Sequence, residues 1–158
     1  MRTVVFLVSS LLVAGSAVAA RFGEVAKAVN DDQKLINAGM DPGSVLARKQ
    51  CGAAILDTDD APNSFNCVFV QTAKDINLFS LEDGYLISEL QAKLNVMDGV
   101  ALQREGRWAQ VQVFSGQKVA AFYLYGDQWI DTEQTEAVYH WLIEHGVPQR
   151  NPRAWIGR

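Results

Sequence analysis

Two cysteines are the side chains with the most defined chemistry in this chain. Cys51 and Cys67 are the only cysteines among the 158 residues. Two thiols with no histidine or third cysteine nearby cannot complete a tetrahedral zinc site, and their separation excludes a Cys-x-x-Cys redox motif. In an oxidising compartment an even cysteine count indicates a disulfide. We therefore expect Cys51 and Cys67 to be joined across the loop 57–64.

The two histidines do not form a metal-binding pair. His140 and His145 lie five residues apart, which on a helix places them about 140° apart, so they cannot bind one metal ion from one face. His140 lies between Glu136 and Glu144 at i−4 and i+4, which is typical of a solvated acidic face. His145 lies near a helix end, where a cation stabilises the helix dipole.

An acidic turn is the remaining candidate for cation binding. Asp57, Asp59 and Asp60 resemble the start of a calcium loop. Pro62 and Val68, however, occupy the positions at which such a loop needs glycine and glutamate. A solvated turn is the simpler interpretation, and we predict no metal site.

Catalytic motifs are absent from the sequence. No Gly-x-Ser-x-Gly elbow, His-Glu-x-x-His, phosphate loop or Gly-x-Gly-x-x-Gly occurs. With 18 acidic residues, no particular carboxylate pair for hydrolysis is identifiable from sequence. We therefore predict no catalytic residue and no cofactor, and consider a binding role more consistent with the sequence than an enzymatic one.

The C-terminal segment 149–158 differs in composition from the rest of the chain. It contains three arginines, no acid, and a tryptophan beside an isoleucine. Tryptophan and arginine are the residues most enriched at binding hot spots. The alternative is that Trp155 and Ile156 fold back onto the sheet while the arginines neutralise an acidic body. The candidate partner-binding residues are Arg150, Arg153, Trp155 and Arg158.

The first twenty residues have the pattern of a signal peptide. Arg2 supplies a positive charge, residues 4–14 are apolar, and 15–20 are the small residues that precede cleavage after Ala19 or Ala20. Residues 1–20 are therefore predicted to be removed on export. No other stretch approaches the about 20 apolar residues of a membrane span, so we expect no membrane anchor after processing and a periplasmic or extracellular location.

The expected mature protein is acidic and has the length of a single domain. Loss of Arg2 leaves 13 Lys and Arg against 18 Asp and Glu, a net charge of −5. Nucleic-acid binding or attachment to anionic membranes would call for excess positive charge, so neither is indicated. Residues 21–158 are predicted to form a single globular α+β domain with a short basic tail at 149–158.

Periodicity predicts helices in the first part of this domain. Apolar residues at helical spacing favour a helix over 25–36 that stops at Gly39. Asp41 and Pro42 have the types of an N-cap and first helical residue, which predicts a second helix through Lys49. Residues 53–56 then have the character of a short strand.

The following residues alternate with a period of two. Residues 66–72 and 76–79 predict strands. Residues 85–95 fit either a helix or, if Gly84 adopts a left-handed conformation in a hairpin, a strand. Helix formers and the spacing of Ile87, Leu90 and Leu94 favour the helix.

An antiparallel meander is the clearest pattern. Strands over 100–104, 107–114, 118–125 and 129–130 are separated by turn residues. In the second of these strands valines alternate with Gln110 and Gln112, which predicts one buried and one solvated face. The third strand is apolar on both faces, which predicts a central strand covered by helices or by a partner.

A last helix completes an α+β architecture. Asp131 or Thr132 can cap it, the run 146–148 ends it, and its expected buried stripe is Val138, Trp141, Leu142 and His145. The predicted fold is an antiparallel β-meander packed against N-terminal and C-terminal helices, with one disulfide.

Together these features predict a small exported protein that binds another protein of the envelope or extracellular space. It would be an inhibitor, an immunity factor or an accessory subunit of the cell envelope. One alternative is a small secreted hydrolase using loop carboxylates. Another is a structural subunit of an envelope oligomer that buries the third strand of the meander.

Overall fold

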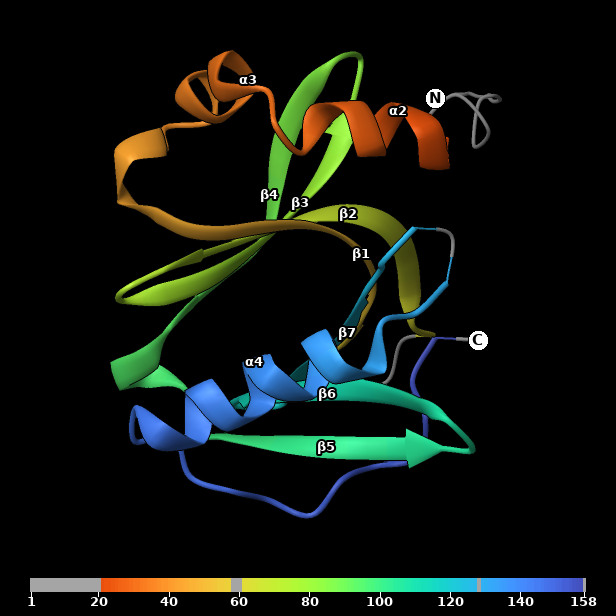
Figure 1. The fold of residues 1–158 in the computed structure, drawn as a ribbon. Helices are drawn as coiled ribbons and strands as arrows, with labels where there is room; N and C mark the ends of the chain where they lie inside the picture. The colour runs from red at the N-terminus through yellow and green to blue at the C-terminus, as the bar shows by residue number, and fades with distance from the viewer. Residues whose placement is uncertain (1–20, 58–60, 128, 158) are drawn as a thin grey trace, which may run out of the picture.

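A seven-stranded antiparallel sheet dominates the computed structural model, which describes residues 21–57, 61–127 and 129–157 (Figure 1). The strand order is β4-β3-β2-β1-β7-β6-β5, so β1 lies between a β2–β4 half and a β5–β7 half. The strands are β1 (Val45–Asp57), β2 (Asn63–Thr72), β3 (Asp75–Glu82), β4 (Tyr85–Lys93), β5 (Gly99–Glu105), β6 (Trp108–Ser115) and β7 (Lys118–Leu124). Helices α2 (Phe22–Ala28) and α3 (Asp32–Asn37) precede the sheet and α4 (Thr132–Glu144) follows it, which confirms the predicted α+β fold.

The N-terminal helical segment is broken, whereas the sequence predicted one helix over 25–36. Asp31 between α2 and α3 has an extended backbone, and its carboxylate accepts hydrogen bonds from the Gln33 and Lys34 amides at 3.1 and 3.3 Å. Such an N-cap starts a new helix and interrupts the preceding one. The predicted stop at Gly39 is confirmed by its φ of +86°.

The second predicted helix, from Asp41 through Lys49, is wrong. The Asp41 carboxylate does cap a turn, accepting from the Gly43 amide at 2.9 Å, but that turn is the short 3-10 helix η2 (Pro42–Ser44). The chain then enters β1, which pairs with β2 and, over its second half, with β7. From Val45 onward the chain pairs with the distant strand β2, so tertiary structure overrides local propensity.

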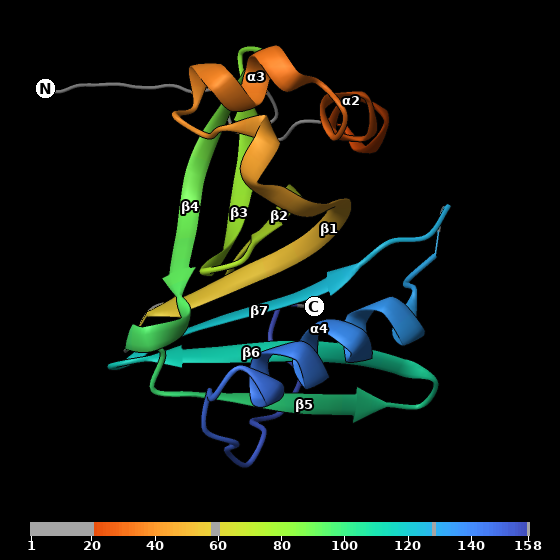
Figure 2. The ribbon, with the colours of Figure 1, turned by 60° about the vertical axis from the view of Figure 1, so that its left-hand side comes forward.

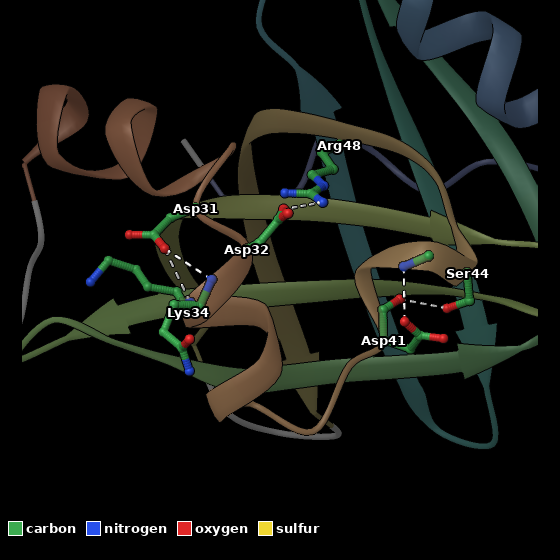
Figure 3. A network of polar contacts seen from close by, with 8 residues as sticks. Asp31, Asp32, Lys34, Asp41, Ser44 and Arg48 are labelled. Atoms are coloured by element: carbon green, nitrogen blue, oxygen red, sulfur yellow. Dashed lines mark hydrogen bonds and ion pairs between the residues drawn. The ribbon is translucent and has the colours of Figure 1, made fainter.

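Polar contacts fasten the N-terminal helices to the sheet (Figure 3). Arg48 Nη2 on β1 lies 2.6 Å from Asp32 Oδ1 on α3, beside the Asp31 and Asp41 caps. Lys34 Nζ donates to the Gly84 carbonyl of the β3–β4 turn at 2.7 Å. These contacts hold α3 against β1 and the β3–β4 hairpin.

Residues 85–93 form strand β4, so the favoured helix over 85–95 is wrong and the hairpin alternative is correct. Asp83 and Gly84 both have positive φ, +51° and +82°, which matches the two-residue turns that join hairpins. A β-bulge lies opposite the Leu78–Phe79 step. It sends Leu86 and Leu90, four residues apart, to opposite faces. This interruption of the strand period explains why the spacing resembled that of a helix.

The β5–β7 meander is confirmed, with two corrections. The fourth predicted strand, 129–130, contributes only an isolated bridge between Tyr125 and Ile130. The predicted wet face of β6 is wrong, because Gln110 and Gln112 are 1 % and 0 % exposed. Their side chains are covered by the C-terminal tail, which the alternation of β6 alone could not reveal.

Helix α4 begins and ends as predicted but is rotated from the expected orientation. The Asp131 carboxylate accepts from the Gln134 amide at 3.0 Å, and Gly146 follows the helix with a φ of +92°. Trp141 is only half-buried and stacks on the exposed His145, with ring centroids 4.5 Å apart. The residues that α4 buries are Thr135, Val138, Tyr139 and Leu142.

Three apolar clusters account for both faces of the sheet (Figure 2). One face packs against α4 through Phe69, Val111 and Phe122. On the other face, α2 and α3 cover Val68 and Val70 of the β2–β4 half. The third cluster, on the β5–β7 half, contains Ala101, Phe114 and Ala121 beneath the tail residue Ile156. The predicted central position of β7 is thus confirmed, and its second apolar face is covered within the chain.

No helix in the described part of the chain is long and apolar enough to span a membrane.

Candidate functional site

A cleft lies where β2 and β3 diverge. The two strands pair only from Gln71↔Ile76 to Val68↔Phe79. Beyond that point β2 continues along β1, and β3 continues along β4. Residues 63–67 and 80–82 therefore border a gap between two arms of the sheet, and Figure 1 shows β2 turning away from the β3–β4 hairpin. A cavity of about 470 Å³ occupies this gap.

The walls of the cleft come from three parts of the chain. Polar side chains outnumber apolar ones, and one wall includes main chain at the end of the tail. The β1–β2 arm supplies Gly52 and residues 63–66, the β3–β4 arm supplies Ser80, Glu82 and Glu89, and the remaining wall is formed by Gln110, Tyr123, Ile156 and Gly157.

Tyr123 owes its place in the wall to a glycine on the neighbouring strand. Gly52 of β1 pairs with Tyr123 of β7, and the tyrosine ring lies over the glycine. A Cβ atom at Gly52 would stand 2.6 Å from the ring and hydroxyl atoms of Tyr123, far inside van der Waals contact. Glycine therefore permits the close approach of this aromatic side chain to the sheet.

Two carboxylates give the opposite wall negative charge. Ser80 Oγ donates a hydrogen bond of 2.6 Å to Glu89 Oε2, which holds the half-buried Glu89 against β3. Glu82 is exposed at the end of β3. Both side chains line the cleft, so a bound molecule would meet a negative potential on this side.

An aromatic cluster continues from Tyr123 toward both chain ends. The ring centroid of Tyr123 lies 6.0 Å from that of Trp155 in the tail and 5.4 Å from that of Tyr125. The ring centroid of Tyr125 in turn lies 4.9 Å from that of Phe22 in α2. The two tyrosine hydroxyls are 3.4 Å apart. Burial, followed by the hydrogen bond and charge of Tyr123, raises the pKa of Tyr125 above its ordinary value of 10.0.

The tail is held against β6 by two buried glutamine side chains. Gln112 Oε1 accepts from the Arg153 amide at 2.8 Å. Gln110 Oε1 accepts from the Ile156 amide at 3.2 Å, while Gln110 Nε2 donates to the Ile156 carbonyl at 2.8 Å. These contacts involve the main chain of the tail, so they fix its course independently of its side chains.

The predicted partner-binding residues do not converge on one point. Arg150 lies over Phe114, with its guanidinium carbon 4.7 Å from the ring centroid. Arg150 and the exposed Arg153 border a shallow hollow beside the β6–β7 turn. Trp155 instead supports the Tyr123 wall of the cleft. Arg158 lies outside the described residues.

The predicted disulfide is present. Cys51 and Cys67 occupy paired positions on β1 and β2, with Cα atoms 4.8 Å apart, and are covalently joined. The bond braces the arm that carries one wall of the cleft. Of the acidic turn that follows, Asp57 ends β1, whereas Asp59 and Asp60 lie outside the described residues.

Metal-binding clusters are absent from residues 21–57, 61–127 and 129–157, where no group of three or more His, Cys, Asp and Glu could hold an ion. His140 is exposed on α4 as expected. His145 Nδ1 lies 2.8 Å from the Trp141 carbonyl, and neither ring lines the cleft.

Sequence reasoning missed an exposed aromatic group that lies outside the cleft. Trp129 is 70 % exposed and borders a shallow hollow with Trp108, over whose ring the Arg107 guanidinium carbon lies at 4.6 Å. The cleft was missed as well, because it depends on strand divergence. A bounded cleft with several kinds of polar group is the stronger candidate site.

Comparison with known proteins identifies no family for this chain. No family model and no curated protein matches the chain. Among solved structures it resembles the hSac2 domain from human phosphoinositide phosphatase Sac2, with a TM-score of 0.43 and 7 % sequence identity. The match covers 80 % of this chain and 92 % of that chain. At this level the resemblance carries no functional argument.

Proposed function

We propose that this chain is an exported binding protein that holds a partner protein at the cleft between β2 and β3. The observation that carries the proposal is the cleft itself. Its volume of about 470 Å³ falls within the range of ligand sites, and it combines carboxylates, a tyrosine and strand-edge main chain. Such a mixture suits recognition of a polypeptide.

Export is supported by the leader pattern of residues 1–20 and by the Cys51–Cys67 disulfide, since disulfides persist mainly in oxidising compartments. A periplasmic or extracellular partner follows from this location. An inhibitor, an immunity factor or an accessory envelope subunit would each bind its partner without chemistry of its own. N-terminal sequencing of the protein from cell fractions tests the leader, and a mature chain that retains residues 1–20 would contradict export.

Site-specific photo-crosslinking tests the binding surface. A photoreactive amino acid is placed at Asn63 in the cleft wall, at Arg153 on the tail, or at Glu133 on α4 as a control, all exposed positions. In cells that naturally make the protein, we expect one crosslinked partner from Asn63 and none from Glu133. Equal yields at Asn63 and Glu133, or no crosslink at either, would contradict the proposal.

The tail residues Arg150, Arg153 and Trp155 remain candidates for an extension of this surface, together with Arg158. Their support is proximity, since Trp155 contacts Tyr123 and Gly157 lines the cleft. A crosslink from Arg153 to the same partner would include the tail in the surface. A crosslink from Arg153 alone would move the binding site from the cleft to the tail.

A second candidate function rests on the shared location of Glu82 and Glu89. Both carboxylates line one polar cleft, and most glycoside hydrolases use a pair of carboxylates for catalysis. In that case Glu89→Gln would abolish hydrolysis of a chromogenic glycoside while the melting temperature stayed unchanged. Absence of hydrolysis by the unmodified protein across α- and β-linked substrates would remove this candidate.

A further inference from the structure

We propose that a hollow beside the C-terminal tail binds an acidic segment of a partner protein through the guanidinium groups of Arg150 and Arg153. This tail hollow lies between the β6–β7 turn and the tail, and it shares no lining residue with the cleft. The inference rests on the proposed function in one respect, because the ligand is taken to be part of a protein. It adds a second site and names the chemistry that this site recognises.

The chemistry of the walls is the first observation. The charged side chains that line the tail hollow are Arg150 and Arg153, and within the described chain no carboxylate lines it. Arginine presents N–H donors in a planar fork that matches the two oxygens of a carboxylate. Gln117, Gln149 and Asn151 add amide side chains to the walls, which can both donate to and accept from the peptide groups of a bound segment. The walls therefore favour an acidic peptide over a cationic or an apolar one.

The fold holds Arg150 in place before a ligand binds. Its amide donates to the Val100 carbonyl, and the Val100 amide donates to the Pro148 carbonyl, each at 2.9 Å. Its side chain passes over Gly99, where an added Cβ would overlap Arg150 Cδ. Its guanidinium carbon lies 4.7 Å from the ring centroid of Phe114. A guanidinium that lies over a ring keeps the N–H groups along its edge for an anion, and such preorganisation lowers the entropic cost of binding.

Arg153 supplies the second positive charge. Its amide donates to the buried Gln112 Oε1 at 2.8 Å, which fixes its main chain, while its side chain is exposed. Among the residues that the structure describes, Arg48 and Arg104 form ion pairs, whereas Arg150 and Arg153 form none. Both charges of the tail hollow are therefore available to a ligand.

Another arginine of the meander provides a direct comparison. Arg107 is exposed like Arg150, and its guanidinium carbon also lies over an aromatic ring, 4.6 Å from the centroid of Trp108. The hollow at Arg107 is lined by Asp127 and Asp131 as well, so positive and negative charges lie together there. An anion at the tail hollow would instead meet positive charge that no lining carboxylate offsets.

One acid lies near the β6–β7 turn at the border of the tail hollow. Asp98 Oδ2 accepts a hydrogen bond from the Gly116 amide at 2.5 Å, and Gly116 lines the hollow. This carboxylate would repel an acidic segment at the turn. The segment should therefore lie along the tail wall, over Arg150 and Arg153.

The test uses the full mature chain, labelled with nitrogen-15, and the synthetic peptide acetyl-Thr-Glu-Val-Glu-Thr-amide. We expect shift changes concentrated at the backbone amides of 149–151 and at the side-chain amides of Gln149 and Asn151. Glutamine in place of both peptide glutamates, or Arg150→Gln with Arg153→Gln in the protein, should weaken binding about tenfold, because two exposed ion pairs are lost. Raising the salt concentration from about 0.05 M to about 0.5 M should also weaken it.

Arg107→Gln is the matched control, since it removes an exposed arginine that also lies over a ring, and it should leave the affinity unchanged. Arg150→Lys with Arg153→Lys keeps both charges but removes the planar forks, so it should weaken binding about threefold. Equal binding of the glutamate and glutamine peptides, shift changes centred elsewhere, or no shift changes at about 5 mM peptide would overturn the proposal. A loss in Arg107→Gln as large as that of the double glutamine variant would overturn it as well.

Inorganic phosphate distinguishes a site for an acidic segment from a general anion site. At the same concentration as the peptide, phosphate should give smaller shift changes at residues 149–151, and larger ones would overturn the acidic segment as the ligand. A crosslinked partner from Asn63 without peptide binding would overturn the tail hollow and leave the proposed function in place. Peptide binding without a crosslink from Asn63 would retain the specificity of the tail hollow and count against the cleft.

Discussion

The β5–β7 half of the sheet is covered by the C-terminal tail, whereas the sheet leaves a cleft between β2 and β3. Over β5–β7 the chain covers its own surface, with Ile156 buried and Gln110 and Gln112 bonded to tail main chain. Between β2 and β3, strand edges and carboxylates border an open cavity. The first region is completed by the chain, whereas the second contains a cavity of about 470 Å³.

The polar side chains of the two regions differ in burial, and therefore in how much they should contribute to stability. The amides of Gln110 and Gln112 are buried and satisfied, so changing their surroundings must cost stability. Glu82 is exposed and Glu89 half-buried at the cleft, so changing them should cost stability little. The comparison therefore predicts contrasting responses in stability for the two regions.

Deletion of residues 153–158 has the largest expected effect. It removes Ile156 from the third cluster and the main-chain partners of Gln110 and Gln112. We expect a loss of about 3 kcal/mol, which lowers the melting temperature by about 10 °C. Thermal unfolding followed by circular dichroism measures it. Arg153→Ala keeps the main-chain contacts and should stay within about 0.5 kcal/mol, while a drop of only a degree or two on deletion would mean that the tail does not cover the core.

Removal of the disulfide comes next. Cys51→Ala with Cys67→Ala releases a link across a sequence separation of 16, and the regained freedom of the denatured chain should cost about 2 to 3 kcal/mol. Urea unfolding measures this loss. Labelling of native protein by iodoacetamide would contradict the bond.

Gly52→Ala tests the close approach that places Tyr123 in the cleft wall. The added Cβ would meet the tyrosine ring, so we expect a loss of about 1 to 2 kcal/mol and displacement of the ring. In Gly52→Ala with Tyr123→Ala, the further cost of the Gly52 change should nearly vanish. Gly23→Ala is the control, because no atom lies within 4 Å of the Cβ position at Gly23. Equal stability of the Gly52 and Gly23 variants would show that Tyr123 moves freely.

Alkaline pH tests the aromatic cluster that joins the two regions. The pKa of Tyr125 is raised in the folded state, so the fold holds that proton more tightly than the unfolded chain does. Its contribution is complete below the ordinary pKa of 10.0 and is lost as pH rises beyond it. Tyr125→Phe should therefore lose less stability above pH 10 than the unmodified protein, as urea titrations at each pH would show. The exposed Tyr85→Phe should leave the pH profile unchanged, and an effect as large as that of Tyr125→Phe would argue against a buried hydroxyl.

Glu82→Gln should have the smallest effect on stability. The side chain is exposed, so we expect a change within about 0.5 kcal/mol, measured by urea unfolding. A destabilisation comparable to that of the tail deletion would show that the cleft wall is structural, and the contrast between the two regions would fail.

Local sequence was sufficient where one element or one bond decided the outcome. The Cys51–Cys67 disulfide, the Asp131 cap, the stop at Gly146 and the β5–β7 meander are all present. Caps and tight turns depend on residues within a few positions of one another, and one cysteine pair permits one connection. These features, with the α+β class, were determined by sequence alone.

Tertiary structure decided the features that depend on distant partners. Pairing with β2 turned residues 45–49 from a predicted helix into part of β1, and a bulge in β4 gave a strand the spacing of a helix. Gln110 and Gln112 alternate like solvated residues, yet they are buried because a tail more than 40 positions away covers them. The cleft likewise exists only because β2 and β3 diverge. Burial and strand pairing are properties of the assembled sheet, since a residue's own neighbours in sequence do not specify what will cover it.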